Sequence, residues 1–220
     1  MKIFLDTANI DDIKKWAPSG LIHGITTNPT HLSKFAKKNP VEHIKEICSI
    51  MSGYDVSVEV TEKDPKDVYD QAKKIGTLAD NVIVKIPCKE EYVAVIKNLV
   101  QEGIAINITL LFSLPQALLM SKLGVKYISP FVGRLDDIDV DGMELISDIR
   151  MMIDTYDFKT QLLAASLRHI RHVHETILRG ADIATMPVKI FEEMFAHPLT
   201  DRGIEIFDND WKKLGIKQFP

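Results

Sequence analysis

The stretch VSVEVTEKDPKDVYDQAKKIGTLADNVIVKIP, residues 56–87, decides the fold, because it holds a strand, a helix and a second strand in direct succession. Its two ends, 56–60 and 81–87, are rich in Val and Ile, which favours buried strands. Between them, Asp64 followed by Pro65 is typical of the first turn of a helix. Two strands joined by a helix are expected to lie parallel in one sheet.

The same alternation of strand and helix patterns continues along the chain. Further strands are expected at residues 2–7, 24–28, 104–109, 126–132, 161–166 and 182–187. Further helical patterns cover residues 89–103, 113–124, 141–155, 167–180 and 188–196. A last helical pattern, which begins at residue 199, is surplus to this alternation.

A sheet of eight parallel strands, each followed by a helix, can close into a barrel. We therefore expect an α/β fold, a (β/α)8 TIM barrel that forms a single domain over residues 1–220. Residues 199–220 are expected to be a C-terminal helical extension that caps the barrel or reaches a neighbouring subunit. The alternative is an open doubly wound sheet, but no Gly-rich phosphate-binding turn follows the first strand.

Composition and charge exclude several classes of partner. The chain is 45% hydrophobic and 26% charged, as in an ordinary soluble protein, and its net charge of −4 argues against nucleic acid as the main partner. No apolar run has transmembrane length, and Asp6 interrupts the apolar N-terminus, so neither a membrane partner nor a signal peptide is expected. Cys48 and Cys88 have no metal-ligand spacing and suggest no disulfide framework. The expected location is the cytoplasm.

Polar side chains stand at the carboxyl ends of the expected strands, where catalytic residues gather in a barrel. They are Asp6, Asn28, Glu59, Lys85, Thr109, Ser129 and Ser166. Because side chains two residues apart share a face of a strand, Asn107 is expected to point the same way as Thr109. A polar residue at a strand end can instead cap a helix or form a turn, and Asp6 and Asn28 would both suit that role.

Lys85 is the most unusual of these residues, because it lies inside an apolar strand and a closed barrel has no edge where its ammonium could reach water. One explanation is a buried ion pair with Glu59 or Asp6. The other is chemical: burial lowers the pKa of a lysine, and a neutral amine can form a Schiff base with a carbonyl carbon. The protonated imine would accept electrons from a breaking carbon–carbon bond, while the two carboxylates transfer protons.

The segment LRHIRHVHE, residues 167–175, places His169 and His172 three residues apart on an expected helix. This spacing could bind a metal. The favoured interpretation is instead a solvated basic face, in which His174, Arg168 and Arg171 join the two histidines. Arg168 would reach the barrel mouth from the start of the helix.

Arg134 and Arg168 each follow a strand end, and a guanidinium can bind a phosphate through two N–H groups. Arg134 could instead pair with Asp136 or Asp137 on its own loop. No P-loop is present that would bind phosphate in another way.

The chain resembles the small-subunit transaldolases, class I Schiff-base barrels related to fructose-6-phosphate aldolase. The resemblance rests on the motifs FLDTANI, GITTNPT, VSVEV, VIVKIP, INITLLFS, ISPFVGRLDDID, DGMELI, LAAS, RHV, GADIATMP and HPLTDRGIE. It implies that Lys85 is the Schiff-base lysine and Asp6 the general acid/base at the C4 hydroxyl. It also implies that Glu59 and Thr109 hold a catalytic water.

The resemblance further implies two sets of substrate contacts. Asn28, Asn107 and Ser129 match the residues that hold the dihydroxyacetone unit. Arg134, Ser166 and Arg168 match the phosphate anchors.

Two positions separate the branches of this family. The aldolase branch carries Gln and Tyr where this chain has Glu59 and Phe131, and it lacks equivalents of Asn107 and Ser129. A phenol at position 131 could orient a water that protonates the carbanion and releases free dihydroxyacetone. Phenylalanine cannot, which favours transfer over release.

The resemblance therefore implies transfer of a dihydroxyacetone unit from sedoheptulose 7-phosphate or fructose 6-phosphate to glyceraldehyde 3-phosphate or erythrose 4-phosphate. It implies no metal and no organic cofactor. It also implies a homo-oligomer, often a decamer of two pentamers, with the C-terminal helix packed on a neighbour. Two alternatives are a fructose-6-phosphate aldolase and, more distantly, a non-catalytic barrel that binds sugar phosphates.

Overall fold

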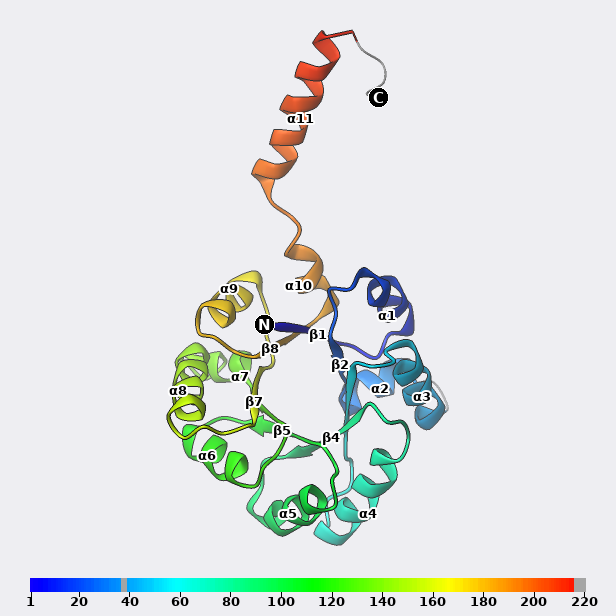
Figure 1. Cartoon of the computed structure of the whole chain (residues 1–220), viewed down its shortest axis with the longest axis vertical. Coiled ribbons are helices and arrows are strands. Elements are labelled where there is room, and N and C mark those ends of the chain that lie inside the picture. Colours follow the sequence, from blue (N-terminus) through cyan, green and yellow to red (C-terminus); the bar gives the residue numbers. More distant parts are fainter. Residues whose placement is uncertain (37–38, 216–220) are drawn as a thin grey trace.

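The computed structural model of the chain describes residues 1–36 and 39–215. Within these residues, eight parallel strands pair in chain order and β1 also pairs with β8, so the sheet closes into a barrel (Figure 1). The strands are β1 (Lys2–Asp6), β2 (Gly24–Thr26), β3 (Asp55–Glu59), β4 (Val82–Pro87), β5 (Ile106–Leu111), β6 (Tyr127–Pro130), β7 (Gln161–Ala164) and β8 (Ile183–Met186). The prediction of a (β/α)8 barrel is confirmed.

Helices surround the barrel on its outer side (Figure 1). The α-helices are α1 (Ile10–Trp16), α2 (Pro29–Phe35), α3 (Pro40–Ile50), α4 (Pro65–Gly76), α5 (Val93–Gln101), α6 (Leu114–Lys122), α7 (Val132–Asp136), α8 (Gly142–Thr155), α9 (Ile170–Leu178), α10 (Val188–Glu193) and α11 (Pro198–Lys213). Short 3₁₀ helices, η1 (Ala17–Ser19) and η2 (Glu90–Tyr92), precede β2 and α5. The helical pattern at 89–103 is therefore divided between η2 and α5.

Several helices begin with a proline in the first turn and a side chain that caps it. Asp64 accepts a hydrogen bond from the Lys66 backbone at 2.9 Å, so α4 begins where the Asp-Pro pair predicts. Asn28 caps α2 in the same way, accepting from the backbone of His31 at 2.9 Å. The strand expected at 24–28 therefore ends at Thr26, because Asn28 already belongs to the start of α2.

Alternate residues of the strands build a second, smaller core. Buried Phe4, Ile83, Tyr127, Leu163 and Ile183 contact one another in this cluster, apart from the larger core that contains the helices. A polar residue follows two positions later on several of these strands, as Lys85 follows Ile83. The polar residues thus share a face with an apolar layer and lie nearer the carboxyl ends of the strands.

The register of the strands aligns the central residues of the predicted site. Lys85 on β4 is the partner of Glu59 on β3 and of Asn107 on β5. The pairing of β5 with β6 is irregular between Ile108 and Leu111, and Leu110 has a positive φ of 54°. Leu110 lies in the part of β5 that extends beyond the strand expected at 104–109.

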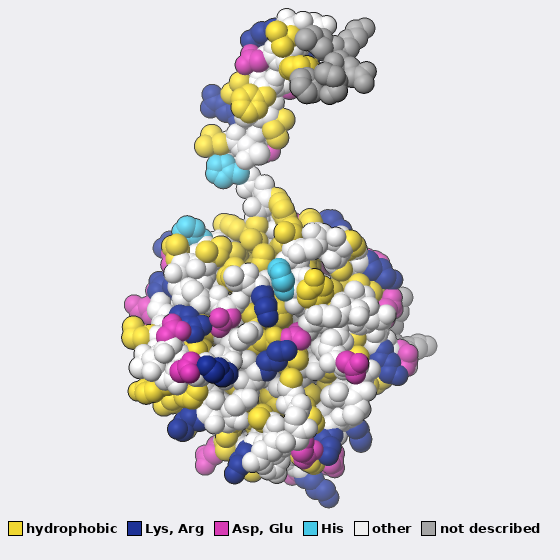
Figure 2. Space-filling view, viewed as in Figure 1, with side chains coloured by type: hydrophobic (Ala, Val, Ile, Leu, Met, Phe, Trp, Pro, Cys, Tyr) yellow, Lys and Arg dark blue, Asp and Glu magenta, His cyan; other side chains and the backbone are white. Residues whose placement is uncertain are grey.

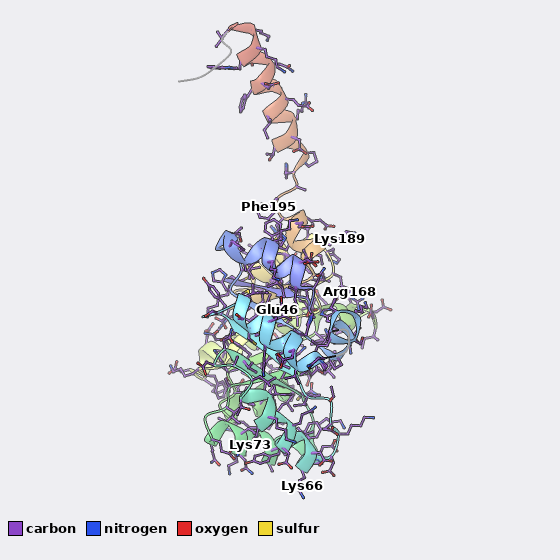
Figure 3. The ribbon with its side chains drawn as sticks, turned by 90° about the vertical axis from the view of Figure 1, so that its right-hand side faces the viewer. Glu46, Lys66, Lys73, Arg168, Lys189 and Phe195 are labelled. Carbon is purple, nitrogen blue, oxygen red and sulfur yellow. The ribbon has the colours of Figure 1, made fainter. Side chains whose placement is uncertain are left out.

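Helix α11 projects away from the barrel beyond Phe195 and covers neither of its ends (Figures 1 and 3). No described side chain of α11 is buried, and hydrophobic side chains are visible along it (Figure 2). The helical extension is confirmed for residues 199–213, and residues 216–220 lie outside the described residues. Among the described helices, none combines the length and the apolar composition needed to cross a bilayer.

Candidate active site

A cavity of about 140 Å³ opens at the carboxyl ends of the strands. The predicted site residues that line it are Asp6, Asn28, Lys85, Ser129, Phe131, Arg134 and Ser166. Thr26, Leu163, Ala165 and Thr185 complete its lining. The structure thus brings most of the predicted residues to one place, and the remaining four, Glu59, Asn107, Thr109 and Arg168, lie outside this lining.

Lys85 is buried, with 5% of its surface exposed. Its Nζ lies 3.1 Å from Oε2 of Glu59, and it donates a hydrogen bond to the carbonyl oxygen of Thr27 at 3.2 Å. The ring centroid of Phe131 is 5.9 Å from the same nitrogen. The ion pair with Glu59 that the sequence left open is therefore present, at the wall of the cavity.

Asp6 does not cap a helix; its carboxylate faces hydroxyl and imidazole groups. The Thr26 hydroxyl donates to Oδ1 of Asp6 at 2.8 Å and is also 2.6 Å from the hydroxyl of Thr185. Nδ1 of His31 lies 3.7 Å from the same carboxylate oxygen. Thr26 could have been found by its position two residues before Asn28, whereas nothing in the local pattern singles out His31.

Asn107 is held in a buried hydrogen-bonded chain with two serines. Ser129 donates to Oδ1 of Asn107 at 2.6 Å, and Nδ2 of Asn107 donates to the hydroxyl of Ser57 at 3.0 Å. Ser129 lines the cavity, so it connects Asn107 to it. Because both of its functional atoms are bonded, the orientation of the Asn107 amide is fixed. Sequence analysis did not identify Ser57.

Thr109 follows Asn107 on the same face of β5 and is fully buried. Its hydroxyl makes no hydrogen bond to any other residue that the structure describes. Buried hydroxyls are nearly always hydrogen-bonded in proteins, to protein atoms or to ordered water. With no partner among the described residues, the Thr109 hydroxyl is therefore free to hydrogen-bond a water or a ligand.

Two of the predicted phosphate anchors line the cavity and the third does not. The guanidinium of Arg134 lies 5.1 Å from the centroid of the Phe131 ring, and Ser166 sits nearby with a φ of 60°. Arg168 instead binds Asp137 with both terminal nitrogens. That guanidinium holds the pKa of the Asp137 carboxyl below its usual range. Asp137 thus pairs with Arg168 and not with Arg134, which was the alternative expected from the sequence.

The histidines of residues 167–175 do not form one solvated face. His174 is exposed, but His172 is buried, and its Nε2 lies 2.8 Å from Asp136. The backbone N–H of Arg168 donates to Nδ1 of His172 at 3.1 Å. Burial, together with the neighbouring His169 ring, lowers the pKa of His172. The prediction of a solvated basic face is wrong for His172, because its side chain is buried and paired with Asp136, the last residue of α7.

Comparisons with known proteins agree with this arrangement. The model of the family described as Transaldolase/Fructose-6-phosphate aldolase matches residues 3–218. A protein of Lactiplantibacillus plantarum named "Probable transaldolase" is 50% identical over 218 residues, 99% of this chain and 100% of its own length. Proteins with the same name from Leptospira biflexa and Aquifex aeolicus are 50% and 47% identical, and each match covers at least 97% of both chains. The chain belongs to the transaldolase/fructose-6-phosphate aldolase family.

Proposed function

We propose that this chain is a transaldolase that works through a Schiff base on Lys85. The donor would be sedoheptulose 7-phosphate or fructose 6-phosphate, and the acceptor glyceraldehyde 3-phosphate or erythrose 4-phosphate. The observation that carries the proposal is a buried lysine at a cavity wall with a carboxylate 3.1 Å from its nitrogen. Membership of the family and the names of the relatives support it.

In the first step, Lys85 passes one proton to Glu59, and the neutral amine attacks the C2 carbonyl of the ketose. The resulting carbinolamine loses its hydroxyl as water and becomes a protonated imine. Glu59 returns the proton that the leaving hydroxyl needs. The unused hydroxyl of Thr109 supports a water held between Thr109 and Glu59 for this step.

In the second step, Asp6 takes the proton of the C4 hydroxyl and the C3–C4 bond breaks. The bonding electrons move to the imine nitrogen, so an enamine remains on Lys85 and an aldose phosphate leaves. Thr26 donates to Oδ1 of Asp6 and so fixes one carboxylate oxygen, which leaves the other for the substrate. The acceptor aldehyde then adds to the enamine by the reverse path, and Asp6 returns its proton.

The enamine must wait on Lys85 until an acceptor arrives. The wall next to Lys85 is the Phe131 ring, which has no hydrogen-bonding group that could orient a protonating water. Retention of the enamine favours transfer over the release of free dihydroxyacetone. Asn28, Asn107 and Ser129 are proposed to hold the hydroxyls of the three-carbon unit.

The phosphate of either sugar is proposed to bind between Arg134, Ser166 and Arg168. Arg134 and Ser166 line the cavity on the side of Phe131. Arg168 starts from the loop that also carries Ser166, so it can approach the same ligand by turning its guanidinium.

We also propose that the chain forms a homo-oligomer through α11. Exposed Ile204 and Phe207 on α11 and exposed Leu214 at its C-cap recur at helical spacing, and the barrel does not cover this helix. Exposed apolar side chains gathered along one element usually mark an interaction surface. A neighbouring copy is the proposed partner, and a decamer of two pentamers is the proposed assembly.

Borohydride reduction in the presence of fructose 6-phosphate, followed by intact-mass measurement, tests the proposed function. A covalent three-carbon or six-carbon adduct is expected on the wild type and on the control Lys89→Ala, which removes an exposed lysine after the same strand. The adduct should be lost in Lys85→Met, which keeps an unbranched side chain one atom shorter and removes the amine. An adduct that survives in Lys85→Met refutes the Schiff base, and absence of any adduct favours a barrel that only binds sugars.

The same protein distinguishes transfer from cleavage. Without an acceptor aldehyde, a transaldolase should release at most about one equivalent of aldose phosphate per active site. Continuous accumulation of free dihydroxyacetone would instead identify a fructose-6-phosphate aldolase.

A further inference from the structure

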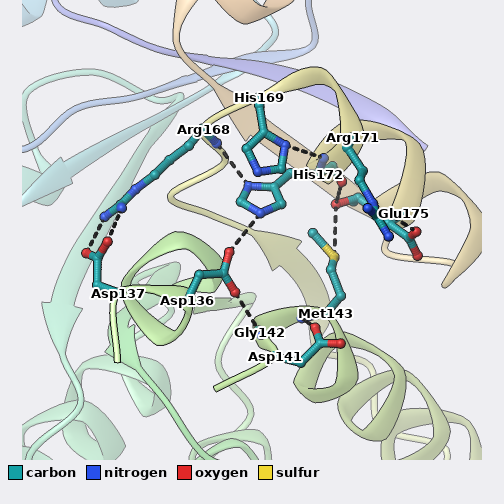
Figure 4. Close-up of polar contacts among 11 residues, drawn as sticks. Asp136, Asp137, Asp141, Gly142, Met143, Arg168, His169, Arg171, His172 and Glu175 are labelled. Carbon is teal, nitrogen blue, oxygen red and sulfur yellow. Dashed lines mark hydrogen bonds and ion pairs between the residues drawn. The ribbon is translucent and has the colours of Figure 1, made fainter. Parts of the chain in front are cut away.

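Arg168 and Asp137 join two loops at the mouth of the barrel. Arg168 follows β7, and Asp137 is the C-cap residue directly after α7 (Figure 4). Nη1 and Nη2 of Arg168 donate to Oδ1 and Oδ2 of Asp137, the second bond at 2.6 Å. This is the paired geometry in which a guanidinium also binds a phosphate.

The main chain of Arg168 is fixed by contacts on both sides. Its N–H donates to His172, whose other ring nitrogen is held by Asp136. The N–H of Gly133 donates to the carbonyl of Ser166 at 3.1 Å. The loop that carries Arg168 is therefore anchored, and only the side chain beyond it can turn.

The stem of Arg168 lies against Gly133. A Cβ atom at Gly133 would stand 2.6 Å from Nε of Arg168 and 2.5 Å from the carbonyl oxygen of Ser166. The Nε edge of the guanidinium thus faces the backbone of α7, while the edge formed by the two terminal nitrogens is taken by Asp137. A phosphate that approaches this terminal edge must replace the carboxylate.

We infer that Asp137 is an internal competitor for the substrate phosphate at Arg168 and so sets the affinity of the site for phosphorylated sugars. The inference rests on the proposed phosphate site. In the free protein Asp137 holds the guanidinium; a phosphate dianion displaces it; after product leaves, Asp137 takes the guanidinium again. The side chains are 45% and 52% exposed, so the pair opens readily.

The expected size of the effect follows from this exposure. An exposed ion pair is favoured over the separated side chains by at most about fivefold. Phosphate binds only the protein in which the pair is separated, so the apparent affinity falls in proportion to the fraction of that form. Removal of the Asp137 charge should therefore tighten phosphate binding by roughly two- to sixfold.

Titration of the full-length protein with inorganic phosphate, followed by calorimetry or ³¹P NMR, tests the inference. Asp137→Asn should bind phosphate roughly two- to sixfold more tightly than the wild type. Asp139→Asn is the matched control, because it removes an exposed negative charge from the same loop at a left-handed position that Asn tolerates. It should change the affinity by less than half as much. If Asp137→Asn is unchanged or binds more weakly, Asp137 orients Arg168 and does not compete.

Two further variants separate this inference from the proposed phosphate site. Arg168→Gln should weaken phosphate binding, and the double variant Asp137→Asn/Arg168→Gln should show no gain over Arg168→Gln alone. If Arg168→Gln binds phosphate like the wild type, Arg168 is not a phosphate anchor and both ideas fail. If Arg168→Gln weakens binding while Asp137→Asn has no effect, the phosphate site stands and only the competition is refuted.

Discussion

Nζ of Lys85 lies 3.1 Å from Oε2 of Glu59, and the two residues are register partners on β4 and β3. Each side chain is largely buried, with 6% and 13% exposed. A buried pair of this kind loses solvation for both charges, and removal of one partner leaves the other uncompensated. The pair also provides a short path for one proton, which is what a Schiff-base lysine needs before it can attack a ketone. The observed geometry therefore fits both a structural ion pair and a catalytic pair. The two roles differ in whether the rate of Schiff-base formation falls when Glu59 is replaced by an uncharged residue.

Glu59→Gln should slow formation of the borohydride-trapped adduct by at least ~10²-fold, because the glutamine amide cannot accept the proton of Lys85. The rate of adduct formation, measured by quenched mass spectrometry, checks this. Glu62→Gln is the control, since Glu62 is exposed just beyond the same strand. Thermal melting shows whether each variant is folded. A folded Glu59→Gln protein with the wild-type rate would leave the pair a purely structural role.

Phe131→Tyr should raise the release of free dihydroxyacetone relative to transfer by about tenfold, because one positioned hydroxyl supplies a modest part of a 10²- to 10⁴-fold proton-transfer effect. The ratio is measured by assaying both products from fructose 6-phosphate with and without acceptor. Phe112→Tyr is the matched control, because its ring contacts Phe131 at 6.0 Å but does not line the cavity. An equal ratio in both variants would show that residue 131 does not decide between the two reactions.

The fold was predictable because each strand–helix unit carries its own local signals. The Asp64–Pro65 pair that begins α4 and the Val- and Ile-rich composition of β4 can both be recognised from neighbouring residues alone. Strand ends were less predictable. Whether Asn28 continues β2 or caps α2 depends on a hydrogen bond to His31, which strand periodicity does not encode.

The site was predictable where strand parity decides the direction of a side chain. Lys85, Asp6 and Ser129 all line the cavity for that reason. The alternation of side-chain direction stops where a strand ends, so it does not predict contacts between loops. The partners of Arg168 and His172 are Asp137 and Asp136 at the end of α7, more than 30 residues earlier in the chain, and only the folded barrel brings them together.

Acidification should destabilise the protein through His172. Because burial and His169 lower the pKa of His172 in the fold, the unfolded chain binds a proton first as the pH falls through its usual value of about 6.5. The contribution to stability is therefore constant above pH 6.5 and is lost as the pH falls toward the folded pKa. Protonation also removes the acceptor that the Arg168 N–H uses.

The measurement is the melting temperature of the wild type and of His172→Gln between pH 7.5 and pH 5. On acidification, the melting temperature of the wild type should fall further than that of His172→Gln. The extra fall should be roughly 2–4 °C for each kcal/mol of stability that protonation of His172 removes. His174→Gln, an exposed histidine on the same helix, should behave like the wild type. If His172→Gln and the wild type fall in parallel, His172 does not titrate in this range.

Phe207→Asp should dissociate the proposed assembly while the barrel stays folded. Phe207 is 76% exposed in this chain, and α11 has no buried side chain among its described residues, so the substitution removes no contact within the barrel. In an assembly, the new carboxylate would be buried against an apolar surface without a partner, which is strongly unfavourable. Asn209→Asp adds the same charge to the same helix at an exposed polar position and is the control.

Light scattering coupled to size-exclusion chromatography measures the mass, and circular dichroism measures the fold. We expect a multimer for the wild type and for Asn209→Asp, and a monomer or smaller species for Phe207→Asp with an unchanged spectrum. A wild-type protein that is monomeric at micromolar concentration would refute the assembly. A multimer that survives Phe207→Asp would place the interface on the barrel, because α11 would then carry none of the free energy of association.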